Sequence, residues 1–417
     1  MSLPVAILLL VLAGVAARTL GLLRLAIWQV MVLGAAAVLL TGGIAPLAAA
    51  RSVDPSVMVF LAAMFLLGEA MERSGYLAHL AGILFARAGS VDALVLMVMF
   101  GAGAASALFM NDTLAVIGTP LVLILACKRH VEPRLLLLAL AFAVTLGSVM
   151  SPIGNPQNLL IAVHGGMPSP FVSFFGWLGV PTLINLLLAY GVLRLRFRKH
   201  FHRIAPGGVP PEVSDPPLAW LARAGMLILL GLVGVRIALR AAGVAPDLPL
   251  AAAAAVAAAP LLLFSRRRLE LLRNLDWATL VFFAALFILV RSVWDTGFFQ
   301  GWVDRLHPAL GSVPTVLMVS VFLSQVLSNV PLVALYLPLL IHGNASEAVL
   351  LALAAGSTVA GNLFILGAAS NVIIAQGAER RGVSALSFSE FASTGVPLTL
   401  INLAVYWAYF HWVYASG

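Results

Sequence analysis

The chain has few charged residues and almost no cysteine. Only 10% of its 417 residues are Asp, Glu, Lys or Arg, whereas 62% are hydrophobic. A water-soluble domain of this length carries far more charge, so the composition predicts a polytopic membrane protein. The single cysteine, Cys127, excludes an internal disulfide framework and a multi-thiolate metal cluster within one chain. We therefore expect the chain to lie in a lipid bilayer.

The chain also lacks the sequence features of nucleic-acid binding, ATP hydrolysis and intramembrane proteolysis. Its net charge of +8 comes from basic residues in short loops between apolar segments, not from one continuous basic face. No HExxH motif is present, and the histidines lie in loops or at the ends of apolar segments. We expect no enzymatic reaction, no cofactor and no nucleic-acid partner. An ATP-driven pump would need a separate ATPase partner.

Apolar segments long enough to cross a bilayer fill most of the sequence. In each half, one segment is interrupted near its middle and the next contains a polar break. The expected segments of the first half are 3–20, 25–49, 55–73, 92–126 (interrupted), 134–163 (broken) and 171–195. Those of the second half are 218–239, 246–264, 275–294, 313–342 (interrupted), 347–376 (broken) and 389–413. Two amphipathic stretches, 76–87 and 298–310, are expected to form interfacial helices.

Residue-level similarity relates the two halves by duplication. Residues 54–76 align without gaps on 276–298, and 140–163 align on 353–376. We predict a first repeat at 1–197, a cytoplasmic linker at 198–217 and a second repeat at 218–417. If each interrupted segment is a re-entrant hairpin, each half has an odd number of crossings and the second repeat is inverted. The predicted fold is all-α, with about ten transmembrane helices, two re-entrant hairpins and helices broken at the midplane.

The basic residues test this topology because Lys and Arg gather in the cytoplasmic loops of membrane proteins. In the inverted arrangement, all but five of the 24 Lys and Arg residues lie on one side of the membrane. The five on the other side are Arg51, Arg236, Arg240, Arg291 and Arg305. The richer side is predicted to be cytoplasmic. This places the protein in the inner (plasma) membrane with both termini on the outer face.

Polar clusters lie at the interruption of each hairpin and at the break of each broken segment. Irregular backbone at membrane depth is tolerated only where protein buries it or where it lines a cavity. Paired interruptions therefore point to the binding site of a transporter. The candidate substrate-binding or ion-binding residues are Asn111, Asp112, Thr113, Gly154, Asn155, Gln157, Asn158, Ser328, Asn329, Gly367, Ser370 and Asn371.

Asp112 is the acidic residue at the centre of such a cluster, and an intramembrane carboxylate is a functional-site hypothesis by default. Two functional roles fit. It is either a Na⁺ ligand together with Asn111 and Asn155, or a proton carrier, because burial favours the neutral carboxyl group. A third role, capping the second helix of the hairpin, stays open because Asn-Asp-Thr is good N-cap chemistry. Val330 occupies the matching position in the second half, which indicates one charged coupling site.

The breaks suit an anion. Pro152 and Pro156 remove backbone donors and release carbonyls, and the helix that restarts after them points its N-terminus into the protein. A helix N-terminus attracts negative charge, which favours an anionic or strongly dipolar substrate. Three polar residues of the second broken segment either supply further ligands or bond carbonyls of their own helix: Ser357, Thr358 and Asn362.

Four motifs resemble those of the ion transporter superfamily, more narrowly the ArsB/NhaD permeases and their SLC13-like relatives with a citrate-transporter-like domain. They are FMNDTLAVIGTP at 109–120, PIGNPQNLLI at 152–161, SQVLSNVP at 324–331 and LGAASNVI at 366–373. The resemblance implies a fixed scaffold, a mobile transport part, a homodimer, and a substrate and coupling ion bound between hairpin tips and broken helices. Such relatives carry arsenite or antimonite, dicarboxylates and citrate, sulfate or silicate, or exchange Na⁺ for H⁺.

The function predicted from these observations is ion-coupled secondary transport of a small anion, oxyanion or carboxylate by an elevator mechanism. The coupling ion is H⁺ or Na⁺, bound at Asp112. An arsenite or antimonite efflux permease and a Na⁺/H⁺ antiporter without an organic substrate are the alternatives. Dicarboxylate carriers resemble one another in having Ser-Asn-Thr at the tips, whereas here Asp112 replaces the first Asn and Val330 the second Thr.

Overall fold

The computed structural model describes residues 2–19, 25–204, 211–242, 249–298, 311–383 and 386–416. Within these ranges the chain forms helices and no strand, apart from a single β-bridge between Ser90 and Arg203. Seven of the described helices are long and apolar enough to cross a membrane, and shorter apolar helices accompany them. The predicted all-α polytopic membrane fold is confirmed.

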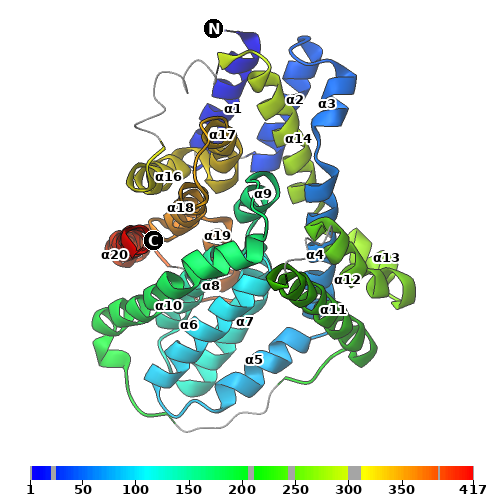
Figure 1. Ribbon diagram of the computed structural model, residues 1–417. Coiled ribbons are helices and arrows are strands. Elements are labelled where there is room, and N and C mark those ends of the chain that lie inside the picture. The colour runs from blue at the N-terminus through cyan, green and yellow to red at the C-terminus, as the bar shows by residue number, and fades with distance from the viewer. Residues whose placement is uncertain are drawn as a thin grey trace.

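The first half follows the predicted order of elements (Figure 1). Its helices are α1 (Leu3–Thr19), α2 (Ile27–Leu40), α3 (Pro46–Ser52), α4 (Pro55–Arg73), α5 (Tyr76–Ala86), α6 (Val91–Leu108), α7 (Asn111–Arg129), α8 (Pro133–Val149), α9 (Pro156–His164) and α10 (Pro170–Arg196). The single segment predicted at 25–49 is wrong, because α2 ends at Leu40. Gly42 follows with a φ of 71°, a left-handed conformation that ends the helix, and α3 begins at Pro46.

The second half repeats this order after the short helix η1 (Arg198–His200). Its elements are α11 (Pro216–Ala241), α12 (Leu250–Phe264), α13 (Arg268–Arg273), α14 (Trp277–Trp294), α16 (Val313–Leu327), α17 (Asn329–His342), α18 (Glu347–Val359), η2 (Ala360–Asn362), η3 (Ile365–Gly367), α19 (Ala369–Glu379) and α20 (Phe388–Ser416). The interfacial helix predicted at 76–87 is α5. Most of its predicted counterpart at 298–310, and residues 205–210 of the predicted linker, lie outside the described residues.

Helix contacts recur between the two halves. Helix α2 of the first half packs on α14 of the second, and the equivalent pair is α12 with α4. In the same way, α7 packs on α19, and the equivalent pair is α17 with α9. Each of these four contacts joins one half to the other. Within the halves, α6 packs on α8 as α16 packs on α18. This repetition is what an internal duplication produces, and it means that neither half buries its apolar faces alone.

Each hairpin turns at the polar residues that the sequence places there. Helix α6 ends at Leu108 and α7 begins at Asn111, while α16 ends at Leu327 and α17 begins at Asn329. The second turn consists of Ser328 alone, with φ 69° and ψ 157°. This backbone conformation is essentially reserved for glycine and costs about 1–3 kcal/mol in other residues. Strain of this kind is typical of functional sites.

Helices α6 and α8 touch backbone to backbone. A Cβ atom added to Gly147 would lie 2.1 Å from the carbonyl oxygen of Gly103, and one added to Gly154 would lie 2.7 Å from that of Ser106. The hydroxyl of Ser106 also donates to the carbonyl of Val144 at 2.6 Å. Small residues therefore allow the first hairpin to lie directly against the first broken helix.

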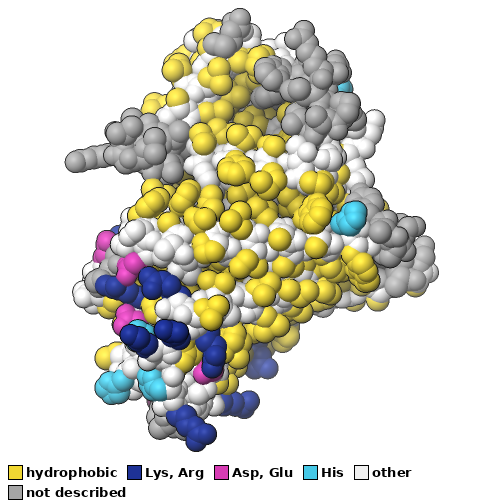
Figure 2. Space-filling model, turned by 90° about the vertical axis from the view of Figure 1, so that its left-hand side faces the viewer, with side chains coloured by type: hydrophobic (Ala, Val, Ile, Leu, Met, Phe, Trp, Pro, Cys, Tyr) yellow, Lys and Arg dark blue, Asp and Glu magenta, His cyan; other side chains and the backbone are white. Residues whose placement is uncertain are grey.

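The surface agrees with a membrane location. Figure 2 shows a face that is mostly hydrophobic, with Lys and Arg side chains gathered toward one end. Large apolar side chains are exposed along α10, among them Phe175 at 65% and Leu187 at 52%. Lipid contact removes the penalty that water would impose on such a surface. The assignment of the basic end to the cytoplasm stays a prediction.

Replacing Gly147 by alanine is expected to destabilise the protein, because the methyl group would overlap the backbone of Gly103. Overpacking of this kind typically lowers the free energy of unfolding by about 1–3 kcal/mol. Gly191→Ala in α10 is the matched control, since a Cβ atom there meets nothing within 4 Å. Thermal unfolding of the purified protein in detergent measures both variants. Equal melting temperatures would contradict the backbone contact between α6 and α8.

Candidate functional site

The first hairpin tip lies on the first break. The backbone N–H of Asn111 donates to the carbonyl oxygen of Gly154 at 3.0 Å. The break separates α8 from α9, and Asn155 caps the restarting helix by accepting from the N–H of Asn158 at 2.9 Å. Gly154 is required because a side chain would collide with the α6 backbone. The structure thus brings together two polar clusters that are far apart in the sequence.

The amide side chains of the first break are buried and largely paired with the protein itself. The Asn155 nitrogen Nδ2 donates to Ser148 Oγ at 3.0 Å and to Thr358 Oγ1 at 3.2 Å. Gln157 Nε2 donates to the same Thr358 oxygen at 3.3 Å. Asn158 Nδ2 donates to three backbone carbonyls of residues 148–151, at 3.0 to 3.3 Å. These contacts satisfy the carbonyls that the break releases.

Thr358 connects the two broken helices. It lies on α18 in the second half and accepts from two amides of the first break. Its own hydroxyl donates to Asn158 Oδ1 at 3.3 Å. Ser357, its neighbour, bonds the carbonyl of Ala354 in its own helix at 3.3 Å. The sequence left open whether these residues supply ligands or bond carbonyls of their own helix. Ser357 bonds a carbonyl of its own helix, and Thr358 bonds the amides of the first break.

The second break is the less satisfied of the two. The Asn371 nitrogen donates to the carbonyl of Gly361 at 2.7 Å, and Gln325 Nε2 donates to that of Ala360 at 2.8 Å. Around these bonds, several buried polar side-chain atoms have no partner among the described residues. They are Ser324 Oγ, Asn329 Oδ1, both polar atoms of Asn362, Ser370 Oγ and Asn371 Oδ1. Buried polar atoms without partners are rare, so this cluster is a candidate for ligand binding.

Tight backbone contacts surround this cluster. A Cβ atom on Gly367 would lie 2.9 Å from the carbonyl of Ala360 and 3.1 Å from Gln325 Oε1. On α20, a Cβ atom on Gly395 would lie 2.1 Å from the carbonyl of Asn362. The predicted residue Gly367 is thus required by its neighbours. Gln325 and Ser324 were absent from the predicted site, although both belong to the second-tip motif at 324–331.

Asp112 reaches across the two halves. It occupies the first turn of α7, but that helix has Met110 as its N-cap and no side-chain capping bond, so capping of its own helix is not observed. The carboxylate instead lies close to the backbone N–H of Ser370, in the first turn of α19. Helix α19 also lacks a side-chain cap of its own. Asp112 is partly exposed, and it meets the positive end of a helix dipole beside the unpaired atoms of the second break.

Thr113 lies where the first hairpin meets α4. A Cβ atom on Gly68 of α4 would lie 3.2 Å from Thr113 Cγ2. Among the described residues, no group of three or more His, Cys, Asp or Glu side chains could hold a metal ion. The predicted participation of Asn111 and Asn155 in Na⁺ binding stays a prediction.

Replacing Thr358 by valine is expected to lower the thermal stability of the protein. The change keeps the shape of the side chain but removes a hydroxyl group that serves Asn155, Gln157 and Asn158. Leaving buried polar groups unpaired costs about 1–3 kcal/mol each. Thr358→Ser retains the hydroxyl and should stay within about 1 kcal/mol of the parent. A valine variant as stable as the serine variant would show that these hydrogen bonds do not hold the broken helices together.

Comparisons with known proteins agree with this geometry. A family model described as citrate transporter matches residues 7–348. An uncharacterized transporter of Mycobacterium bovis is 27% identical over 371 residues, with 85% of each protein covered. The silicon efflux transporter LSI3 of Oryza sativa subsp. japonica is 28% identical over 436 residues, which covers 85% of this chain and 86% of that protein.

A solved structure shares the fold. The crystal structure of the Alcanivorax borkumensis YdaH transporter, described as having an unusual topology, matches with a TM-score of 0.60. The two sequences are 19% identical, and the match covers 88% of each chain. The likeness extends over both halves, so the two proteins share the overall fold.

Proposed function

Because the chain belongs to the citrate transporter family and is therefore a membrane transporter, we propose that it carries a small anion coupled to H⁺ or Na⁺. The observation that supports this most is the position of Asp112. Its carboxylate lies at the N-terminus of α19, beside buried polar atoms of the second break that lack partners. The substrate and the coupling ion bind at this cluster, which we call the Asp112 site: Asp112, Ser324, Asn329, Asn362, Ser370 and Asn371.

The charges of the site explain the coupling. A carboxylate and an anionic substrate repel each other strongly in a poorly solvated interior. A proton or Na⁺ bound at Asp112 removes this repulsion, so that the anion binds well only after the cation has bound. Binding energies linked in this way make the movement of one ion depend on the other. One carboxylate, with Val330 at the matching position of the second half, gives one such coupling site.

The neutral groups of the site favour an anion or oxyanion. The amide nitrogen of Asn362 and the hydroxyl of Ser370 are buried donors without partners, and α19 presents its N-terminus to the same place. Donors without a competing fixed cation suit a small anion that must also be released. Asn329 and Asn371 add carbonyl oxygens, which suit Na⁺ or a protonated hydroxyl group of the substrate.

The packing supports an elevator movement. Hairpin α6–α7 lies against α8 and α19, and hairpin α16–α17 lies against α18 and α9. Both hairpins and both broken helices thus form one block, which carries the Asp112 site. Helices α2, α4, α12 and α14 form a second set of mutual contacts. We propose that the block moves against this set within the inner membrane, in a homodimer whose termini face outward.

A Na⁺/H⁺ antiporter without an organic substrate is the second candidate, since a single titratable carboxylate in the membrane suffices for that exchange. An arsenite or antimonite efflux permease, with or without a separate ATPase partner, is a special case of anion or oxyanion transport. Silicate joins the substrate panel because the relative LSI3 is a silicon efflux transporter.

Proteoliposomes with an imposed pH or Na⁺ gradient distinguish these functions. Internal pH is followed with and without arsenite, antimonite, dicarboxylates, citrate, sulfate and silicate. Proton movement that requires one of these compounds identifies the substrate. Proton movement that requires only Na⁺ establishes the antiporter and contradicts anion transport. No proton movement under any condition would exclude both the antiporter and H⁺-coupled transport of these compounds, and uptake of labelled compounds in the Na⁺ gradient then tests coupling to Na⁺.

Asp112→Asn is expected to reduce gradient-driven uptake by about 5- to 150-fold, the range of typical coupling free energies. The amide keeps the size of the side chain but cannot release a proton and binds cations poorly. Asp295→Asn is the matched control, because Asp295 is exposed and pairs with Arg291 at 2.9 Å outside the Asp112 site. Exchange of labelled substrate without a gradient separates coupling from binding. Full gradient-driven uptake by a folded Asp112→Asn variant would exclude Asp112 as the coupling residue.

A further inference from the structure

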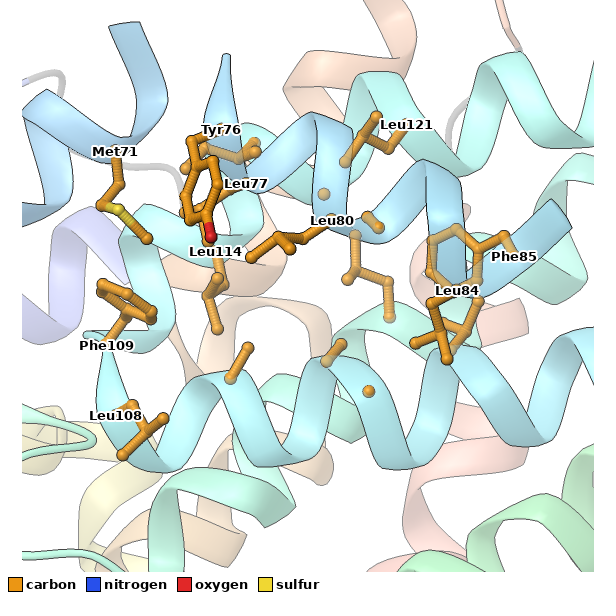
Figure 3. Close-up of a pocket in the computed structure, with 18 of the residues that line it drawn as sticks. Met71, Tyr76, Leu77, Leu80, Leu84, Phe85, Leu108, Phe109, Leu114 and Leu121 are labelled. Carbon is orange, nitrogen blue, oxygen red and sulfur yellow. The ribbon is translucent and has the colours of Figure 1, made fainter. Parts of the chain in front are cut away.

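A second cavity lies apart from the Asp112 site. It has a volume of about 410 Å³ and is enclosed by α5, α6, α7 and α11 together with the end of α4. Figure 3 shows apolar side chains directed into it, among them Leu77, Leu80, Leu84 and Phe109. We call it the α5 pocket. It contains none of the residues of the Asp112 site.

The α5 pocket combines apolar walls with one charged residue. Among the residues that the structure describes, Arg223, near the start of α11, is the only charged one that lines the pocket. It is exposed, and among the described residues it has no ion-pair partner. Nearby Arg73, in contrast, forms ion pairs with Glu69 and Glu270. A free guanidinium group at the mouth of an apolar pocket is arranged to bind a molecule with a hydrocarbon part and an anionic part.

We propose that the α5 pocket binds an anionic phospholipid, with an acyl chain between α5 and the first hairpin and its phosphate on Arg223. A cavity of this size has room for several water molecules, yet apolar walls offer them almost no hydrogen bonds. Lipid tails are the apolar molecules that surround a membrane protein. The guanidinium fork matches the geometry of a phosphate group.

The location of the pocket supports an anionic headgroup. Arg223 lies near the start of α11, directly after the linker, and Arg266, Arg267 and Arg268 follow α12 at the same end of the α11–α12 pair. Basic pockets between membrane helices on the cytoplasmic side attract anionic lipids. Tyr76 provides a further donor, because Figure 3 shows its hydroxyl directed into the pocket. One lipid therefore contacts both the hairpin that carries Asp112 and helix α11.

Lipid binding to the purified protein tests this proposal without any transport assay. The delipidated protein is titrated with phosphatidylglycerol or phosphatidylcholine of identical acyl chains, and bound lipid is counted by native mass spectrometry. The wild type is expected to bind one phosphatidylglycerol about fivefold more tightly than phosphatidylcholine, the effect of one arginine at an anionic surface. Equal affinity for the two lipids would overturn the proposal.

Variants then locate the site. Arg223→Ala should abolish the preference for phosphatidylglycerol, and Arg223→Lys should retain most of it. Arg51→Ala is the matched control, because Arg51 is an exposed basic residue of α3 outside the pocket. Ala102→Phe fills the pocket from α6 and should weaken binding of both lipids. A preference that survives Arg223→Ala places the lipid elsewhere. Because Arg223 is exposed, Arg223→Ala tests the proposal even if Ala102→Phe fails to fold.

Discussion

Backbone polar groups at membrane depth must find partners inside the protein, and the rest of this structure depends on that constraint. An unbroken helix meets it without help, whereas the two broken helices expose carbonyl and N–H groups where no water is available. The first break meets it with its own amides, since Asn158 binds the carbonyls of residues 148–151. The first hairpin tip contributes as well, through the bond from Asn111 to Gly154. Tips and breaks are therefore forced together.

The polar groups of the two breaks are paired to different extents. In the first break the amides of Asn155, Gln157 and Asn158 bond the protein, with Thr358 as a partner from the other half. In the second break, Asn362 has both polar atoms unpaired among the described residues. The first break is thus largely satisfied by the protein itself, whereas the second retains polar atoms without partners among the described residues. Asp112 adds its charge to the second from the tip of the first hairpin.

Close backbone contacts make this arrangement possible. Gly147 and Gly154 allow α6 to touch the first broken helix, and Gly395 allows α20 to touch the carbonyl of Asn362. These contacts leave no room for a side chain at the three glycine positions. The strained Ser328 lies at the edge of the block, where its conformation positions Asn329. Between the first hairpin and α11, the α5 pocket is lined mainly by apolar side chains.

The sequence by itself determined the membrane class, the order of elements, both hairpins and the positions of both breaks. These follow from local rules, namely apolar segments of bilayer length and interruptions by Gly, Pro and Asn. It did not reveal the end of α2 at Leu40, because a Gly-Gly turn inside an apolar run looks continuous in hydropathy. Tertiary structure alone decided which polar residues bond one another. Asn158 and Asn371 align with each other in the sequence, yet Asn158 Oδ1 accepts from Thr358 at 3.3 Å, whereas Asn371 Oδ1 has no partner in the part of the chain that the structure describes. It also decided that Asp112 lies at the N-terminus of α19, because that proximity joins residues from opposite halves of the chain.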